Sequence, residues 1–183
     1  MTTSSWARRA TSSGAFAAWT LAAALGCGKG GPPSAAPPGA PPVSSREPVD
    51  FAFDSIDDRV VDAESTRGAI TVIAFVTTEN LASQAQLDFL VAMAKHDGTR
   101  VHYAAVALEP KESREIVELY RKALSIPFPV ALADARTLAG DGPFGDVRTV
   151  PAVVILDRAG RVAWRTEGHV ARSDELREAM RGL

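Results

Sequence analysis

The chain has 183 residues, a length that suggests one folded domain with extensions. Its formal net charge is −2, and its lysine and arginine residues form no cluster of the kind that phosphate binding needs. We therefore predict no nucleic-acid partner. None of the histidines at positions 96, 102 and 169 has a second ligand at metal-site spacing, so we predict no metal and no other cofactor.

The first 27 residues have the three-part pattern of an export signal. Arg8 and Arg9 precede an apolar stretch at residues 14–25. This stretch is short for a membrane-spanning helix, which needs about 20 residues. A twin-arginine signal built on Arg8 and Arg9 is one alternative, although the residues that follow the pair match that motif poorly.

Cys27 is the only cysteine of the chain and follows Ala24-Leu25-Gly26. These four residues resemble the lipobox of bacterial lipoproteins, in which the signal is removed before a cysteine that then carries lipid. The resemblance implies a lipoprotein-type signal peptide at residues 1–27 and membrane attachment through Cys27. Gly28 after the cysteine implies the outer membrane of a Gram-negative cell. An ordinary secretory signal, with an incidental cysteine, is the alternative and would give a periplasmic or secreted protein.

Residues 28–48 are rich in proline and glycine and show no apolar periodicity. Such a segment forms no core and acts as a semi-extended tether of about 3 Å per residue. The remaining residues, 49–183, are numerous enough to bury one hydrophobic core without disulfides. We therefore expect one folded domain held away from a membrane by a spacer.

The folded domain opens with a short strand or hairpin around residues 51–62. The unbroken apolar run at residues 70–76 predicts a strand that is covered on both faces. We expect Thr77 or Thr78 to cap the helix that follows, with its buried face formed by Leu87, Leu90, Val91 and Ala94. A second buried strand is predicted at residues 101–108.

A second helix is expected after Glu109-Pro110, with Ile116, Leu119, Tyr120 and Ala123 on one face. Short extended and helical segments should follow at residues 128–132 and 134–139, and a glycine-rich loop at residues 140–148. Two strands at residues 150–157 and 161–165 surround a turn at Gly160, which indicates a hairpin. A final helix capped by Ser173 completes an α/β fold.

Three segments of this domain resemble the thioredoxin-like proteins of the TlpA/ResA (redoxin) type, which are membrane-tethered thiol-disulfide proteins of the bacterial envelope. They are the strand-turn-helix at residues 70–90, Phe128-Pro129-Val130, and Thr149-Val150-Pro151 with the hairpin after it. The resemblance implies a thioredoxin-like fold, with a central mixed β-sheet flanked by helices, a terminal β-hairpin and a C-terminal helix. It also implies a cis peptide bond before Pro151, which lines the substrate groove in that family.

The family's catalytic motif is Trp-Cys-x-x-Cys, and the corresponding residues of this chain are Glu79-Asn80-Leu81-Ala82-Ser83. Asn80 and Ser83 thus replace both redox cysteines, and we predict no catalytic residue for thiol-disulfide exchange. Asn80 cannot attack a disulfide, and Ser83 would need an adjacent base.

The resemblance also implies which residues surround the former active site. It places Arg148 across a groove from Glu79, where the two side chains could form a contact. Glu109 lies near a position where family members often carry an acid, although an acid that opens a helix is the alternative. The residues that we expect to line the groove are Thr78, Glu79, Arg148, Val150 and Pro151.

These features favour a membrane-anchored envelope protein without intrinsic thiol-disulfide activity, whose former active-site groove binds a peptide or protein partner. One alternative is a structural or assembly domain in which the groove is vestigial. Another is a redoxin-type enzyme that acts through different chemistry, for example through Ser83 or Glu109.

Overall fold

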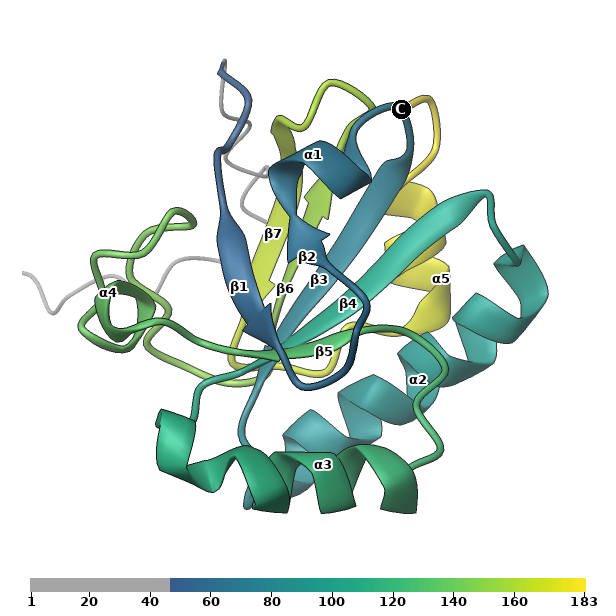
Figure 1. Ribbon diagram of the computed structural model, residues 1–183. Coiled ribbons are helices and arrows are strands. Elements are labelled where there is room, and N and C mark those ends of the chain that lie inside the picture. Colours follow the sequence, from purple (N-terminus) through teal and green to yellow (C-terminus); the bar gives the residue numbers. More distant parts are fainter. Residues whose placement is uncertain (1–46) are drawn as a thin grey trace, which may run out of the picture. The chain divides into compact units, whose positions relative to one another are not determined.

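The computed structural model describes residues 47–183 (Figure 1). The predicted signal peptide, the predicted lipidation site at Cys27 and residues 28–46 of the predicted tether lie outside the described residues. No helix within residues 47–183 is both long and apolar enough to cross a membrane.

The described residues contain one seven-stranded sheet with the strand order β2-β1-β5-β4-β3-β6-β7. Strands β3, β4 and β5 are parallel, whereas β1, β2, β6 and β7 join the sheet through antiparallel pairs. The expected mixed sheet with a terminal hairpin is therefore confirmed. The strands are β1 (Ala52–Ser55), β2 (Val61–Asp62), β3 (Ile70–Val76), β4 (Val101–Ala107), β5 (Val130–Leu132), β6 (Ala152–Leu156) and β7 (Val162–Glu167).

The helices connect these strands largely where the periodicity predicts them. The predictions did not include α1, a single turn in which the Asp62 carboxylate caps the helix by accepting from the Ser65 N–H at 2.7 Å. The last helix begins at Ser173, but its N-cap is Arg172, which makes no capping bond, so the predicted Ser173 cap is wrong. The helices are α1 (Ala63–Thr66), α2 (Leu81–Asp97), α3 (Arg114–Ala123), α4 (Ala135–Leu138) and α5 (Ser173–Ala179), with a 3-10 turn at Lys111–Ser113.

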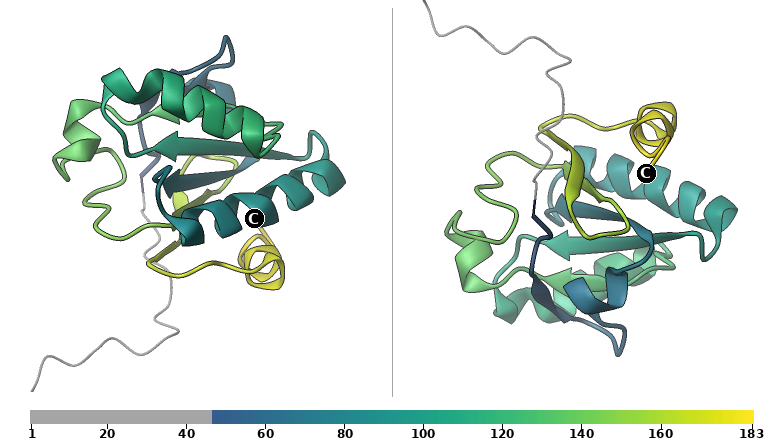
Figure 2. Two further views of the ribbon diagram at one scale, coloured as in Figure 1. Left: turned by 90° about the horizontal axis from the view of Figure 1, so that it is seen from below. Right: turned by 90° about the horizontal axis from the view of Figure 1, so that it is seen from above.

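Two apolar clusters lie on the two faces of the sheet. Helices α2, α3 and α5 contribute Leu87, Val117 and Leu176 to one cluster, which packs on alternate residues of β3. Figure 2 shows these helices on the same side of the strands. The other cluster contains four phenylalanine rings whose centroids lie 5.1–6.3 Å apart. Because side chains alternate along a strand, β3 contributes to both clusters, as expected for a strand buried on both faces.

Helix α2 buries the face that its sequence predicts, since Leu87, Leu90 and Val91 all lie in the core. Helix α3 does not: Val117 is fully buried, while Ile116 and Leu119 are 58% and 60% exposed. The structure buries the stripe that runs through Val117, Tyr120 and the C-cap residue Leu124. Of the predicted face, Tyr120 packs against the core as expected, whereas the rest is exposed, because periodicity alone did not distinguish the two overlapping stripes.

Two polar contacts join α2 to the C-terminal part of the domain. The buried Gln86 side chain donates to the Ala171 carbonyl at 3.2 Å and accepts from the Ala171 N–H at 2.7 Å. At the other end of α2, Asp97 accepts hydrogen bonds from the Tyr103 hydroxyl at 2.6 Å and from Arg177 at 3.2 Å. Together these contacts link α2, β4 and α5.

Candidate functional site

The start of α2 is capped by Asn80. Its Oδ1 accepts a hydrogen bond from the Ser83 N–H at 2.9 Å, and its own backbone is extended. Asparagine is one of the preferred N-cap residues because its side chain satisfies a free helical N–H group. The predicted cap at Thr77 or Thr78 was wrong, since four residues, 77–80, separate the end of β3 from the start of α2 at Leu81.

Ser83 faces the interior of the protein. The residue is fully buried, and its hydroxyl oxygen accepts a hydrogen bond from the Thr77 N–H at 3.3 Å. No carboxylate or imidazole of residues 47–183 bonds to this hydroxyl. A serine nucleophile needs both an adjacent base and access to a substrate, so the arrangement gives Ser83 a structural role in the turn.

Glu109 joins the loop after β4 to the loop after β3. Its Oε1 accepts from the Thr78 N–H at 3.0 Å and from the Thr78 hydroxyl at 2.9 Å. The residue does not open α3, because the 3-10 turn begins at Lys111 and α3 itself at Arg114. The helix-opening interpretation of Glu109 is therefore wrong. Instead, this carboxylate fixes the residue that precedes Glu79 and Asn80.

Two exposed side chains flank the Asn80 cap. Glu79 is exposed and has no hydrogen bond or ion pair with another residue in the part of the chain that the structure describes. Leu81, the first residue of α2, is 79% exposed, more than any other large apolar side chain among residues 47–183. Leu81 was not among the residues predicted for the site, although its helical position, opposite the buried Leu90, could have indicated its exposure.

The loop before β6 lies beside this turn. The register pairs Ala152 with Phe75, so Pro151 lies next to the end of β3. The Val150–Pro151 bond is cis, as the resemblance implied. Pro151 is buried, and Val150 is half-buried. The structure thus places Pro151 next to the strand end that residues 77–80 follow.

Arg148 does not contact Glu79. Its guanidinium forms an ion pair with Asp146, two residues earlier, and its backbone N–H donates to Glu167 at 3.3 Å. The Arg148 guanidinium therefore pairs with Asp146 and not with Glu79. The Arg148 side chain remains 82% exposed, so its charge stays at the protein surface.

The three histidines are dispersed over the domain. His96 contacts Asp97, and His169 contacts Thr166 and Glu175. His102 lines a cavity at the opposite end of β4 from Glu109. No group of three potential metal ligands occurs within residues 47–183. The Asn80 site, which we define as Thr78, Glu79, Asn80, Leu81, Arg148, Val150 and Pro151, therefore contains one amide, two opposite charges and an exposed leucine, without a thiol.

No protein-family model matches the chain, and no curated protein matches it. Solved structures do. A DsbF homologue from Corynebacterium diphtheriae superposes with a TM-score of 0.66 at 17% sequence identity, covering 81% of this chain and 97% of that one. The chain has a thioredoxin fold. A thioredoxin family protein from Chlorobium tepidum, described as a thiol:disulfide interchange protein, has a TM-score of 0.62 at 17% identity, covering 77% and 95% of the two chains.

A third structure with this thioredoxin fold is a secreted disulfide oxidoreductase from Mycobacterium tuberculosis, with a TM-score of 0.60 at 17% identity. It covers 73% of this chain and 96% of the other. The names of all three describe proteins of disulfide chemistry or their homologues. This chain has only Cys27, so its folded domain contains no cysteine. The fold is therefore shared while the residues of thiol exchange are absent.

Proposed function

We propose that this protein is a thioredoxin-fold binding protein without thiol-disulfide activity, and that its Asn80 site binds a peptide or protein partner. One observation carries the proposal: at the turn where the resemblance expects two cysteines, the chain has a capping asparagine and a buried serine, with an exposed leucine between them. Neither Asn80 nor Ser83 provides a nucleophile. Leu81 instead presents an exposed apolar side chain at the turn, which a bound partner would cover.

The contacts around the turn support a binding role because they hold it in one conformation. Asn80 bonds to Ser83, Ser83 bonds to Thr77, and Thr78 bonds to Glu109. A surface fixed before binding loses less conformational entropy when a partner docks. We also propose that Cys27 is lipidated and that the domain works in the cell envelope, which agrees with the secreted nature stated for one structural neighbour.

The absence of redox activity is tested by restoring the cysteines. In a full chain carrying Cys27→Ser, we expect no reduction of insulin by dithiothreitol beyond the uncatalysed rate. The same chain with Asn80→Cys and Ser83→Cys should accelerate the reaction, because a cysteine at a helix N-terminus has a lowered pKa. Catalysis by the chain that retains Asn80 and Ser83 would contradict the proposal.

The binding role is tested by capture of envelope proteins on the immobilised full chain. A partner of the Asn80 site should be retained by the native chain and lost with Leu81→Asp. Leu119→Asp is the matched control, because Leu119 is 60% exposed on α3, outside the Asn80 site. Equal retention by both variants, or no retained protein, would instead favour a structural or assembly domain with a vestigial site.

A further inference from the structure

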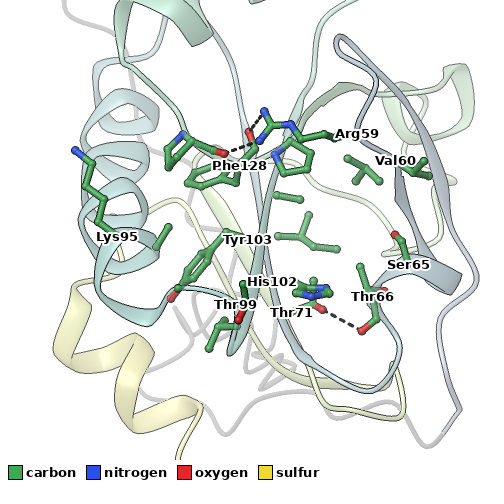
Figure 3. Close-up of a pocket in the computed structure, with 18 residues that line it drawn as sticks. Arg59, Val60, Ser65, Thr66, Thr71, Lys95, Thr99, His102, Tyr103 and Phe128 are labelled. Carbon is green, nitrogen blue, oxygen red and sulfur yellow. Dashed lines mark hydrogen bonds between the residues drawn. The ribbon is translucent and has the colours of Figure 1, made fainter.

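A cavity of about 460 Å³ lies at the opposite end of β3 and β4 from the Asn80 site. The C-terminal part of α2 forms one wall, and the β1–β2 turn with α1 forms the other. Figure 3 shows Lys95 on the first wall, Val60 and Ser65 on the second, and Tyr103 of β4 between them. The volume lies in the range of pockets that enclose a small ligand or a short peptide.

The floor of this cavity is an edge of β4 that no strand covers. Strand β5 pairs only with Ala105, Val106 and Ala107, so the first four residues of β4 extend beyond it. The Ala105 N–H bonds to the Pro129 carbonyl at 3.0 Å, on the β5 side. In a parallel ladder every second residue faces the same neighbour, so the backbone groups of Tyr103 and Val101 also face this side.

These backbone groups have no partner there. Apart from the β3–β4 ladder, no hydrogen bond joins the backbone of Val101 or Tyr103 to another group of residues 47–183. The neighbouring segment contains Pro127 and Pro129, and a proline lacks the N–H group that would extend a ladder. Two N–H and two C=O groups therefore face the cavity, which is the arrangement to which an added strand binds.

The walls are fixed in the free protein. Arg59 is held by Asp57 at 2.6 Å and donates to the Pro127 carbonyl and, at 3.0 Å, to the Phe128 carbonyl. This contact ties the β1–β2 turn to the segment before β5. An incoming peptide would therefore meet a preformed cavity, which lowers the entropic cost of binding.

The two walls differ in chemistry. Val60 is 61% exposed on one wall, whereas Lys95 on the other is exposed and forms no ion pair within residues 47–183. The cavity lining includes Arg59, Lys95 and His102 but no aspartate or glutamate. Successive side chains of a strand point to opposite faces of the sheet. An added strand would thus direct one side chain toward Val60 and the next toward Lys95.

We propose that this cavity binds an extended peptide segment of another protein, which adds as a strand to the free edge of β4. The segment carries an apolar residue next to an acidic residue, facing Val60 and Lys95 respectively. About three residues of the segment, roughly 10 Å of strand, match the length of the free edge. This site is separate from the Asn80 site and does not depend on the function proposed there.

The test begins with a selection from a library of random heptapeptides displayed on phage, using the immobilised full chain. Selected peptides are synthesised with a fluorescent label, and their dissociation constants are measured by fluorescence polarisation. We expect peptides that place an apolar residue next to an acidic one. Methylation of a peptide N–H that pairs with β4 should weaken binding by about fivefold to tenfold, because it removes one hydrogen bond and leaves the side chains unchanged.

Charge exchange tests the position of the peptide. Lys95→Glu should weaken binding of an acidic peptide, and a peptide with lysine in place of its acid should recover binding to this variant. Lys111→Glu is the control, because Lys111 is an exposed lysine outside the cavity. Leu81→Asp should leave binding unchanged, which separates this site from the Asn80 site. The proposal is overturned by no enriched peptide, by binding that ignores N-methylation, or by equal effects of Lys95→Glu and Lys111→Glu.

Discussion

Gln86 is predicted to be among the most important polar side chains for the stability of the domain. The side chain and Ala171 are both fully buried, and they share two hydrogen bonds of 3.2 and 2.7 Å. Gln86→Leu keeps a similar volume but leaves the Ala171 N–H and C=O without partners. An unsatisfied buried group costs about 1–3 kcal/mol, and burial of the leucine offsets part of this, so we expect a loss of about 2–4 kcal/mol.

Urea unfolding of the full chain, followed by circular dichroism, measures this loss. For a domain of this size 1 kcal/mol corresponds to about 3–5 °C in Tm, so the melting temperature should fall by roughly 6–20 °C. Gln84→Leu is the matched control on the same helix, because Gln84 is half-buried and its side chain has no hydrogen bond among residues 47–183; its effect should stay within about 0.5 kcal/mol. Equal effects of the two substitutions would refute the reasoning.

Three further predictions concern stability. Burial raises the pKa of Asp97, but hydrogen bonds, first that from Tyr103, lower it more, so its net pKa is depressed. Asp97 therefore stabilises the fold above its unfolded pKa of about 3.9, and this contribution is lost as the pH falls through the lower folded pKa. The free energy of urea unfolding should fall less between pH 7 and pH 3 for Asp97→Asn than for the native chain. Asn80→Ala should cost about 1 kcal/mol in urea unfolding through loss of the α2 cap, and Asn80→Asp should retain the cap. Gly142→Ala should lower the Tm by several degrees, through a cost of about 1–3 kcal/mol, because its Cβ would lie 2.5 Å from Thr137 Oγ1.

The strands were predictable from the sequence because burial on both faces leaves a strong local signal. The predicted strand at residues 70–76 coincides with β3, and the strand predicted at residues 101–108 ends one residue later than β4. The face of α3 was not predictable, since Ile116 and Val117 belong to two stripes of similar apolar character. Which of the two stripes is buried depends on how α3 packs on the sheet, and in the structure the stripe with Val117 faces the core.

The candidate site was predictable in its residues but not in its contacts. Sequence and resemblance located Asn80, Ser83 and the cis bond before Pro151. They could not show that Glu109 bonds to Thr78, because these residues come from different loops. The cavity beside β4 was not foreseen either, since its walls come from segments far apart in the sequence and its floor exists only because β5 begins opposite Ala105 and leaves the first four residues of β4 uncovered.

The described chain enters the domain at the end of the sheet opposite the Asn80 site. The Val49 N–H bonds to the Gly160 carbonyl at 2.8 Å, in the turn between β6 and β7, and the Gly68 N–H bonds to the Arg158 carbonyl beside it. This turn lies at the opposite end of β6 from Pro151, and Figure 1 shows the chain entering there, close to the start of β3. The chain that enters at Val49 therefore starts from the end of the sheet that lies farthest from the Asn80 site and does not pass over that site.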